Sequence, residues 1–435
     1  MSIREIRAAA AALAILGCAG PSQQHKASLN YLLASRDWAG ATRQLQESKD
    51  TEYASRDAVL YWLDVAAVLH DGGNFKESDQ ALDEAEQRLE ALYTQSISKG
   101  AGTFFLNDTT DDYRGEPHER SLLHILRALN YAYAGRTEEA VVESRKVSAF
   151  LAELGSAVGS NYAYRDDAFA QYLSALLFED AGRRDDARVS YQAAHGAYAA
   201  YASRYGTPEP PYDLGAMGRD EGEVVFLHYV GVAPRKASEA VQVAWNDALI
   251  AVQTTGSDDE NAQVKNAITA GLSANAITVA LPQHVQDPFV IVGSEVEVAG
   301  RRAQTLLVED ISAIAKKALE DRMGTIRSRA IARAAIKFAL AKLAEEETTK
   351  QAGQAWGFLA GLTARAAGAA LEVADTRCWS TIPAQIRMAR VRAPAGRQTV
   401  AVRYSSRAGD FTNGEALTVE VKPGRRTYVH VRTAM

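Results

Sequence analysis

The first half of the chain arranges its apolar and polar positions with a helical period. From about residue 27 to 205, Ala, Leu and Tyr recur at spacings of three and four, which predicts amphipathic helices. A turn signature recurs within this part, with a glycine followed by polar residues and then by a small residue. Its copies lie at 73–78, 135–140 and 182–187, with a weaker copy at 35–40. Each copy separates two helical segments, so the sequence predicts helical hairpins in which the small residue permits close packing.

The pattern changes after residue 206. Three prolines, Pro208, Pro210 and Pro211, end the helical pattern. Apolar runs at 224–230, 276–281 and 290–298 then predict strands, and 309–319 and 326–343 predict two helices that meet near Gly324. Residues 351–373 predict one more helix, rich in small residues. The C-terminal part predicts four short strands, at 385–391, 398–404, 416–421 and 427–431.

The N-terminus has the pattern of a lipoprotein export signal. Arg4 and Arg7 precede an apolar stretch at 8–16, which is too short to span a bilayer but suits a signal peptide. The residues Ile15-Leu16-Gly17-Cys18 resemble the bacterial lipobox, whose cysteine is acylated after cleavage. By this resemblance Cys18 carries the membrane anchor, and Ala19 after it implies the periplasmic face of the outer membrane. An ordinary signal peptide with an incidental cysteine is the alternative.

The hairpin signature resembles the tetratricopeptide repeat (TPR), whose second helix begins with the same register of glycine and small residue. The copies are further apart than the regular repeat, so they would be degenerate and separated by insertions. We therefore expect a mainly α fold, in which a TPR-like helical-hairpin array precedes an α+β region with a small C-terminal β unit. The expected boundaries are 1–17 for the signal peptide, 18–206 for the array, 207–213 for the linker, 214–374 for the α+β region and 375–435 for the β unit.

Charge and cysteine content narrow the function. The net charge of −6 argues against a nucleic-acid partner, which requires a basic surface. The chain has two cysteines, and if Cys18 is lipidated then Cys378 has no partner for an intrachain disulfide. Such a lone thiol is more often a buried small apolar residue than a nucleophile, so we assign Cys378 a structural role.

Four blocks of residues, in order along the chain, resemble an uncharacterised family of TPR-containing bacterial outer-membrane lipoproteins. The blocks are Gly73-Asn74-Phe75; Tyr113-Arg114-Gly115-Glu116 with Glu119-Arg120 and 128–131; 224–228 with Ala233-Pro234-Arg235-Lys236; and Asp375-Thr376-Arg377 through Trp379, Pro383 and Arg390. The resemblance implies an envelope location and supplies no catalytic residues.

Arrays of this kind bind partners through loops and inner-helix aromatic residues, which gives a set of candidate contacts for other envelope proteins. The candidates are Tyr113, Arg114, Asn130, Tyr131, Tyr162, Tyr164 and Tyr172. For Tyr113 and Arg114 the alternative is a structural role at the start of a helix, where charges complement the helix dipole.

Two further patterns have a binding interpretation beside a structural one. Arg329, Arg333 and Lys337 follow each other at four-residue spacing on one helix face, and are either a solvated face or a contact for anionic lipid or cell wall. Gly353, Gly357 and Gly361 form a G-x-x-x-G pattern, which indicates either a buried helix or self-association into a homo-oligomer.

No cofactor or metal site is expected. His118 and His124 are six residues apart, whereas a helical zinc site places two histidines four apart. The sequence thus predicts a non-catalytic scaffold in cell-envelope assembly or maintenance. The alternatives are a cell-wall enzyme, with Glu116 and Glu119 as candidate acids, and a structural subunit of an envelope secretion or surface apparatus.

Overall fold

The computed structural model describes residues 20–97, 111–157, 164–212, 217–248, 250, 276–352 and 374–434. The chain divides into two compact units. The main unit consists of Pro21–Arg235, Val285–Ala318 and Cys378–Met435, and the second unit of Met1–Gly20, Lys236–His284 and Leu319–Arg377. Three separate parts of the chain therefore build the main unit, which contains the functional site described below.

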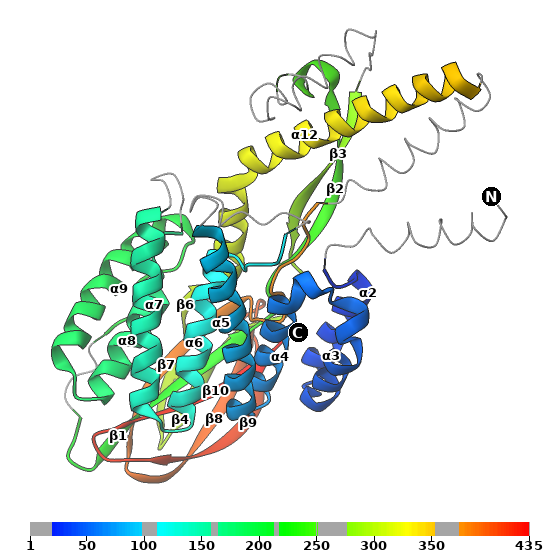
Figure 1. Cartoon of the computed structure of the whole chain (residues 1–435). Coiled ribbons are helices and arrows are strands. Elements are labelled where there is room, and N and C mark those ends of the chain that lie inside the picture. The colour runs from blue at the N-terminus through cyan, green and yellow to red at the C-terminus, as the bar shows by residue number, and fades with distance from the viewer. Residues whose placement is uncertain are drawn as a thin grey trace. The chain divides into compact units, whose positions relative to one another are not determined.

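Consecutive helices of the main unit pack as pairs and lie side by side (Figure 1). In chain order they are α2 (Gln23–Ala34), α3 (Trp38–Glu52), the 3-10 turn η1 (Ser55–Asp57), α4 (Ala58–Asp71), α5 (Phe75–Ile97), α6 (Pro117–Tyr133), α7 (Thr137–Ala157), α8 (Ala168–Asp180) and α9 (Arg184–Arg204).

The hairpin turns follow the prediction from the sequence. Gly73, Gly135 and Gly182 have φ angles of 78°, 70° and 74°, which residues with a Cβ rarely adopt. The small residues five positions later, Ser78 and Ala140 among them, are buried between the paired helices. The helical hairpins predicted at these three turns are confirmed.

Ten strands are described, and eight of them form two four-stranded sheets in the main unit. The first sheet has the order β10-β1-β7-β6, and the second has the order β5-β4-β8-β9. Their strands are β1 (Glu221–Val230), β4 (Ile291–Val298), β5 (Arg301–Gln304), β6 (Leu306–Asp310), β7 (Gln385–Pro394), β8 (Gly396–Ser406), β9 (Phe411–Val421) and β10 (Arg426–Thr433). Strand β1 is parallel to β10 and antiparallel to β7.

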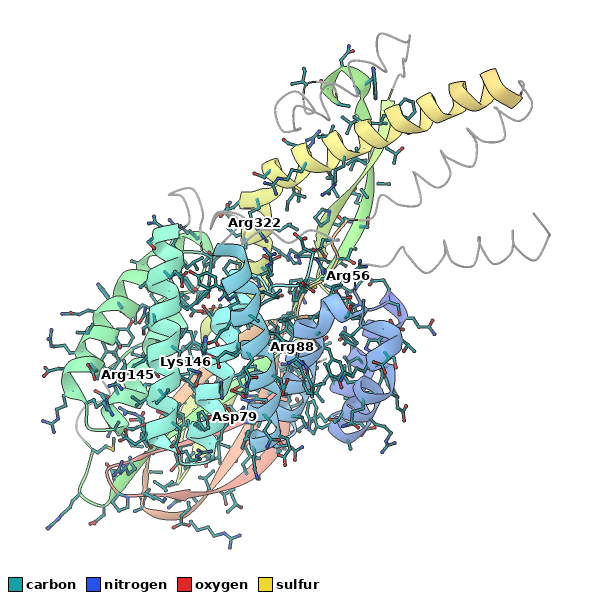
Figure 2. All side chains as sticks on the ribbon, viewed as in Figure 1. Arg56, Asp79, Arg88, Arg145, Lys146 and Arg322 are labelled. Carbon is teal, nitrogen blue, oxygen red and sulfur yellow. The ribbon has the colours of Figure 1, made fainter. Side chains whose placement is uncertain are left out.

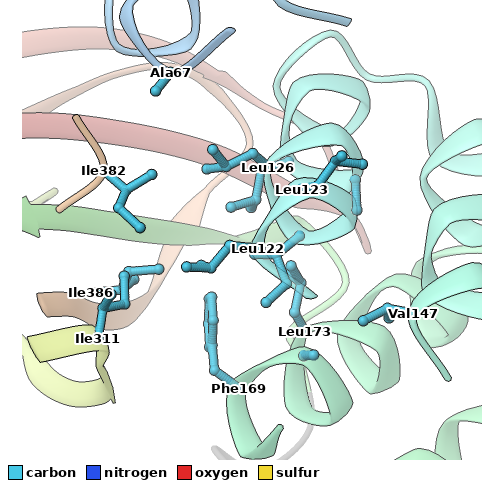
Figure 3. Packing of buried hydrophobic residues seen from close by; sticks show 14 of the residues in the cluster. Ala67, Leu122, Leu123, Leu126, Val147, Phe169, Leu173, Ile311, Ile382 and Ile386 are labelled. Carbon is cyan, nitrogen blue, oxygen red and sulfur yellow. The ribbon is translucent and has the colours of Figure 1, made fainter. Parts of the chain in front are cut away.

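Strand β1 is buried on both faces and connects two cores. Val225 and Leu227 belong to the core shared with the helices, while Val224 and Phe226 belong to the core shared with the second sheet. Side chains of a strand alternate between its faces, so the arrangement is a layer of helices, a first sheet and a second sheet. Figure 3 shows the helix-side core, where Leu122 and other apolar residues of the helices meet side chains from the C-terminal part of the chain.

These sheets overturn the expected fold class. The prediction of a mainly α protein with a separate TPR-like array is wrong, because the helices share one continuous core with β1 and with Ile386 and Met388 of β7. The C-terminal strands also differ from the expected separate β unit, since β7 and β10 pair with β1 in the first sheet. The chain is an α+β protein in which the C-terminal segment completes the core of the helical part.

The second unit contains most of a two-stranded sheet, β2 (Arg235–Ala244) with β3 (Ala276–Val285), and most of the long helix α12 (Ile311–Ala352). Its core places Val243, Trp245 and Ile277 against Ile331 and Ala335 of α12. Helix α12 runs through Gly324 without interruption, so the prediction of two helices meeting there is wrong. A single glycine costs a helix only about 1 kcal/mol, which the neighbouring helix-forming residues offset. Among the described helices, none is long and apolar enough to cross a membrane.

Candidate functional site

The main unit has an open cavity of about 990 Å³ along one face of α9. We call it the α9 pocket. Its walls come from the end of α8, from α9, from Glu209, Tyr212 and Met217, from β7 and from the turn and first residue of β10. The lining residues are Glu179, Asp180, Arg184, Ala187, Arg188, Tyr191, Gln192, His195, Glu209, Tyr212, Met217, Arg392, Gly424 and Arg426.

A buried carboxylate holds the floor of this pocket. Glu223 of β1 stands opposite Arg392 of β7 and Arg426 of β10 in the sheet register. Its nearest guanidinium is that of Arg390, at 2.5 Å, while Arg426 and Arg392 lie at 3.3 and 3.5 Å. Directly opposed and diagonal residues on one sheet face are within contact distance, so three strands bring one carboxylate and three guanidinium groups together.

The charges of this cluster stabilise each other. Burial disfavours the ionised form of Glu223, but the hydrogen bonds from Arg390 and the charges of the arginines outweigh it and lower the pKa of the carboxyl. Arg426 also binds Glu179 at 2.5 Å and Asp180 at 2.9 Å at the end of α8. The cluster therefore ties the first sheet to the helix layer at the base of the pocket.

Arg390 also positions the aromatic wall of the pocket. Its Nη1 donates to the backbone oxygen of Tyr212 at 2.8 Å and to the hydroxyl of Tyr172 at 3.0 Å. The ring of Tyr212 then lies 4.9 Å from that of Tyr172 and 5.2 Å from that of Tyr191, measured between centroids. The proline-rich segment is thus fixed to the sheet, and it presents Tyr212 beside α9.

The wall formed by α9 comes from one helix face. Arg184, Arg188, Tyr191 and His195 have spacings of four, three and four residues, which place them in a row along the helix. At 1.5 Å per residue this row is about 16 Å long. His195 Nδ1 lies 2.9 Å from a carboxylate oxygen of Glu209, which closes one end of the row.

The predicted contact residues lie elsewhere, and most of them are in the interior. Tyr113 is fully buried, and its hydroxyl binds the carboxylate of Glu119. The same carboxylate accepts the backbone N–H groups of Glu116 and Trp379, both at 2.7 Å. Tyr113 and Glu119 therefore connect the segment before α6 to the C-terminal part of the chain, which favours the structural alternative for Tyr113. Arg114 is half-buried in the same segment.

Asn130 is also an interior residue, and it belongs to a polar chain between helices and sheet. Its side-chain oxygen lies 2.6 Å from Nδ1 of His70, and its amide donates to Ser78 at 3.0 Å. The other nitrogen of His70 lies 3.0 Å from the hydroxyl of Tyr229 on β1. Burial, with a smaller effect of His430, holds the pKa of His70 well below its ordinary value. The residue expected to meet a partner protein thus contacts a strand of its own chain through His70.

The remaining aromatic candidates have similar surroundings. Tyr164 and Tyr172 are buried; Tyr164 donates to Asp167 at 2.6 Å. Tyr131 is half-buried, and it donates to Asp79 at 2.8 Å within a network in which Arg127 binds Asp79 and Glu86. Figure 2 shows Asp79 and Lys146 on this part of the helix layer. Tyr162 lies outside the described residues. For Asn130, Tyr164 and Tyr172 the predicted open groove is not formed, because the first sheet covers that side of the helices.

The remaining predicted features are the lipidated cysteine, the glycine pattern, the basic face of α12 and Cys378. Cys18 and the glycines at 353, 357 and 361 lie outside the described residues. Arg329 is exposed and Arg333 half-buried on α12. Lys337 belongs to the same helix, but its side chain is outside the description. A contact between this face and an anionic surface remains a prediction. Cys378 is buried, as its structural role requires.

The candidate acids Glu116 and Glu119, and the buried pair Asp167 and Glu309, are part of the fold rather than of the α9 pocket. Glu116 and Glu119 are both buried, and neither lines the pocket. Burial raises the pKa of Asp167 to about 6, and burial together with Asp167 and Asp310 raises the pKa of Glu309 well above its ordinary value. The described part of the chain contains no cluster of three or more His, Cys, Asp or Glu side chains arranged to hold a metal ion.

Comparison with known proteins gives no match: no family model, curated protein or solved structure resembles the chain significantly. The resemblance to TPR-containing lipoproteins accordingly stays a prediction from the sequence.

Proposed function

We propose that this chain is a lipid-anchored protein of the bacterial cell envelope that binds other envelope proteins at the α9 pocket without catalysing a reaction. The anchor is the lipid on Cys18, and the protein faces the periplasm from the outer membrane. Two or more acyl chains give stable attachment, whereas one gives only marginal binding.

The observation that supports this proposal is the preformed floor of the pocket. The cavity of about 990 Å³ has the size of a typical binding site for a ligand or a short chain segment. Its floor residue Arg426 is held in place by Glu179, Asp180 and Glu223 before any partner arrives. Side chains that are already ordered lose little conformational entropy on binding, so less of the interaction energy with a partner is spent on ordering them.

The test is a cross-linking pull-down of the full-length lipidated protein from its own envelope. The double variant Arg184→Glu/Arg188→Glu reverses two exposed charges of the pocket, and Arg43→Glu on α3 is the matched control for an exposed helix arginine. We expect the wild type and the control to recover the same envelope proteins and the pocket variant to lose them. Recovery of the same proteins by all three forms would reject the pocket as the binding site.

The anchor is tested separately with Cys18→Ser. We expect this variant to lose incorporation of labelled palmitate and to leave the outer-membrane fraction. A Cys18→Ser protein that still fractionates with the outer membrane would show that attachment does not depend on this cysteine.

A further inference from the structure

The acidic groups of the α9 pocket are already engaged within the chain. Glu179 binds Arg426 and accepts the hydroxyl of Tyr191 at 3.0 Å. Asp180 binds Arg426 and accepts the hydroxyl of Tyr428 at 2.7 Å. Glu209 binds His195. A positively charged ligand would therefore compete with partners that these carboxylates already have.

The two arginines at the start of the row have no such partner among the described residues. Arg184 and Arg188 are exposed and line the pocket, and no carboxylate of the described chain lies within ion-pairing distance of either. Guanidinium groups bind carboxylates with strong and directional hydrogen bonds. The charge that the pocket can offer to a ligand is thus positive, and it is concentrated at one end.

The aromatic wall is a pair of packed rings. The centroids of Tyr191 and Tyr212 lie 5.2 Å apart and their planes are tilted by 41°, so the two rings are in contact with each other. Both residues are half-buried and line the pocket, which leaves part of their ring surface for an apolar or aromatic side chain of a ligand. This surface follows Arg188 by about one helical turn, since Tyr191 is three residues further along α9.

We infer that the α9 pocket binds an extended, acidic peptide segment, with a carboxylate side chain at Arg184 and Arg188 and an apolar or aromatic side chain at Tyr191 and Tyr212. The row of about 16 Å accommodates about five extended residues. This inference rests on the proposed function, and it specifies the chemistry of the protein segment that the pocket recognises.

The direct test uses fluorescence anisotropy with the full-length protein in detergent. The probes are labelled pentapeptides with two glutamates followed by alanine, phenylalanine and alanine, synthesised in both sequence orders. Matched peptides contain glutamine instead of glutamate or alanine instead of phenylalanine. We expect the acidic peptide in one order to bind about tenfold more tightly than its glutamine counterpart, because an ion pair with an exposed arginine contributes up to about fivefold and the site has two such arginines.

Variants then locate the binding. Arg184→Gln/Arg188→Gln should remove the preference for glutamate over glutamine, while Arg43→Gln should keep it. Equal binding of the acidic and glutamine peptides by the wild type would overturn the inference. So would tighter binding of a neutral chitin oligosaccharide than of any peptide.

The two levels of the proposal fail in different ways. If the pocket variant loses its envelope partners in the pull-down but the wild type ignores the acidic peptides, the inferred ligand class is wrong and the pocket remains the binding site. If the pull-down is unchanged by the pocket variant, the proposed function itself is wrong.

Discussion

Glu223 is the residue whose replacement tests the structure of the pocket most directly. The substitution Glu223→Gln removes the negative charge and keeps the size of the side chain. It leaves the guanidinium groups of Arg390, Arg392 and Arg426 buried around a neutral amide. Deleting one partner of a buried ion pair costs roughly 3–5 kcal/mol, because the remaining charge has lost its solvation without compensation.

The partners that remain place the expected cost at the lower end of this range. Arg426 keeps Glu179 and Asp180, and Arg390 keeps its hydrogen bonds to the oxygens of Tyr172 and Tyr212. We therefore expect the free energy of unfolding to fall by about 3 kcal/mol at pH 7. For a unit of this size, each kcal/mol lowers the Tm by roughly 2–4 °C, so the expected shift is about 6–12 °C.

The assay is thermal unfolding of the full-length protein, followed by circular dichroism. Glu420→Gln on the exposed strand β9 is the matched control, and its expected effect is within about 0.5 kcal/mol. The pH provides a second check, because the pKa of Glu223 is lowered in the fold. Its stabilising contribution is present above the unfolded pKa of about 4.3 and is lost as the pH falls through the folded pKa. A Tm equal to that of the control at pH 7 would refute the role of Glu223.

Three further predictions concern the rest of the main unit. Glu119→Gln should lower the free energy of unfolding by about 2 kcal/mol in a urea titration, because the NH2 of the new amide would face an N–H donor. Hydrogen exchange at the amide of Trp379 should become faster, and unchanged exchange there would contradict the contact. Gly182→Ala should destabilise the protein by about 1 kcal/mol, because the φ of Gly182 is 74°. Gly196 lies inside α9 with open space around it, so Gly196→Ala should stabilise the protein by up to about 1 kcal/mol. Effects of the same sign would contradict this reasoning. The raised pKa of Glu309 means that the folded state binds this proton more tightly than the unfolded state. The free energy of unfolding should therefore fall as the pH rises from about 4.3 towards the folded pKa. Glu309→Gln should make this fall smaller in unfolding titrations at successive pH values.

The local structure could be predicted from the sequence because it depends on neighbouring residues. Glycine, polar residues and a small residue in fixed order predicted the hairpin turns, and Gly73, Gly135 and Gly182 have the backbone angles that only glycine adopts readily. The apolar run at 224–230 predicted β1 within a few residues. Strand pairing was beyond this reasoning, because the partners of β1 lie about 160 to 200 residues away and the register gives no local signal.

The same limitation explains the error in the contact residues. Tyrosines on the apolar side of a helix have the same spacing whether that side meets a partner protein or a sheet of the same chain. Tyr172 of α8 is in the second situation, because its hydroxyl accepts a hydrogen bond from Arg390 of β7. Asn130 of α6 likewise reaches β1 through His70, and only the pairing of β1 with β7 and β10 shows it. The row from Arg184 to His195 on α9 was missed, although its spacing is that of one helix face, because its counterparts Arg392 and Arg426 come from remote strands.

The burial of the predicted contact residues changes where a partner can bind. In an open helical array the inner face is available to other proteins. Here that face is occupied by the first sheet, and residues such as His70 and Tyr229 connect the two layers in the interior. A partner cannot reach this face without separating one continuous core, whose apolar area is the main contribution to stability. The proposed binding therefore uses another surface, and the α9 pocket provides one, with Arg184 and Arg188 exposed and with Arg426 held by Glu223.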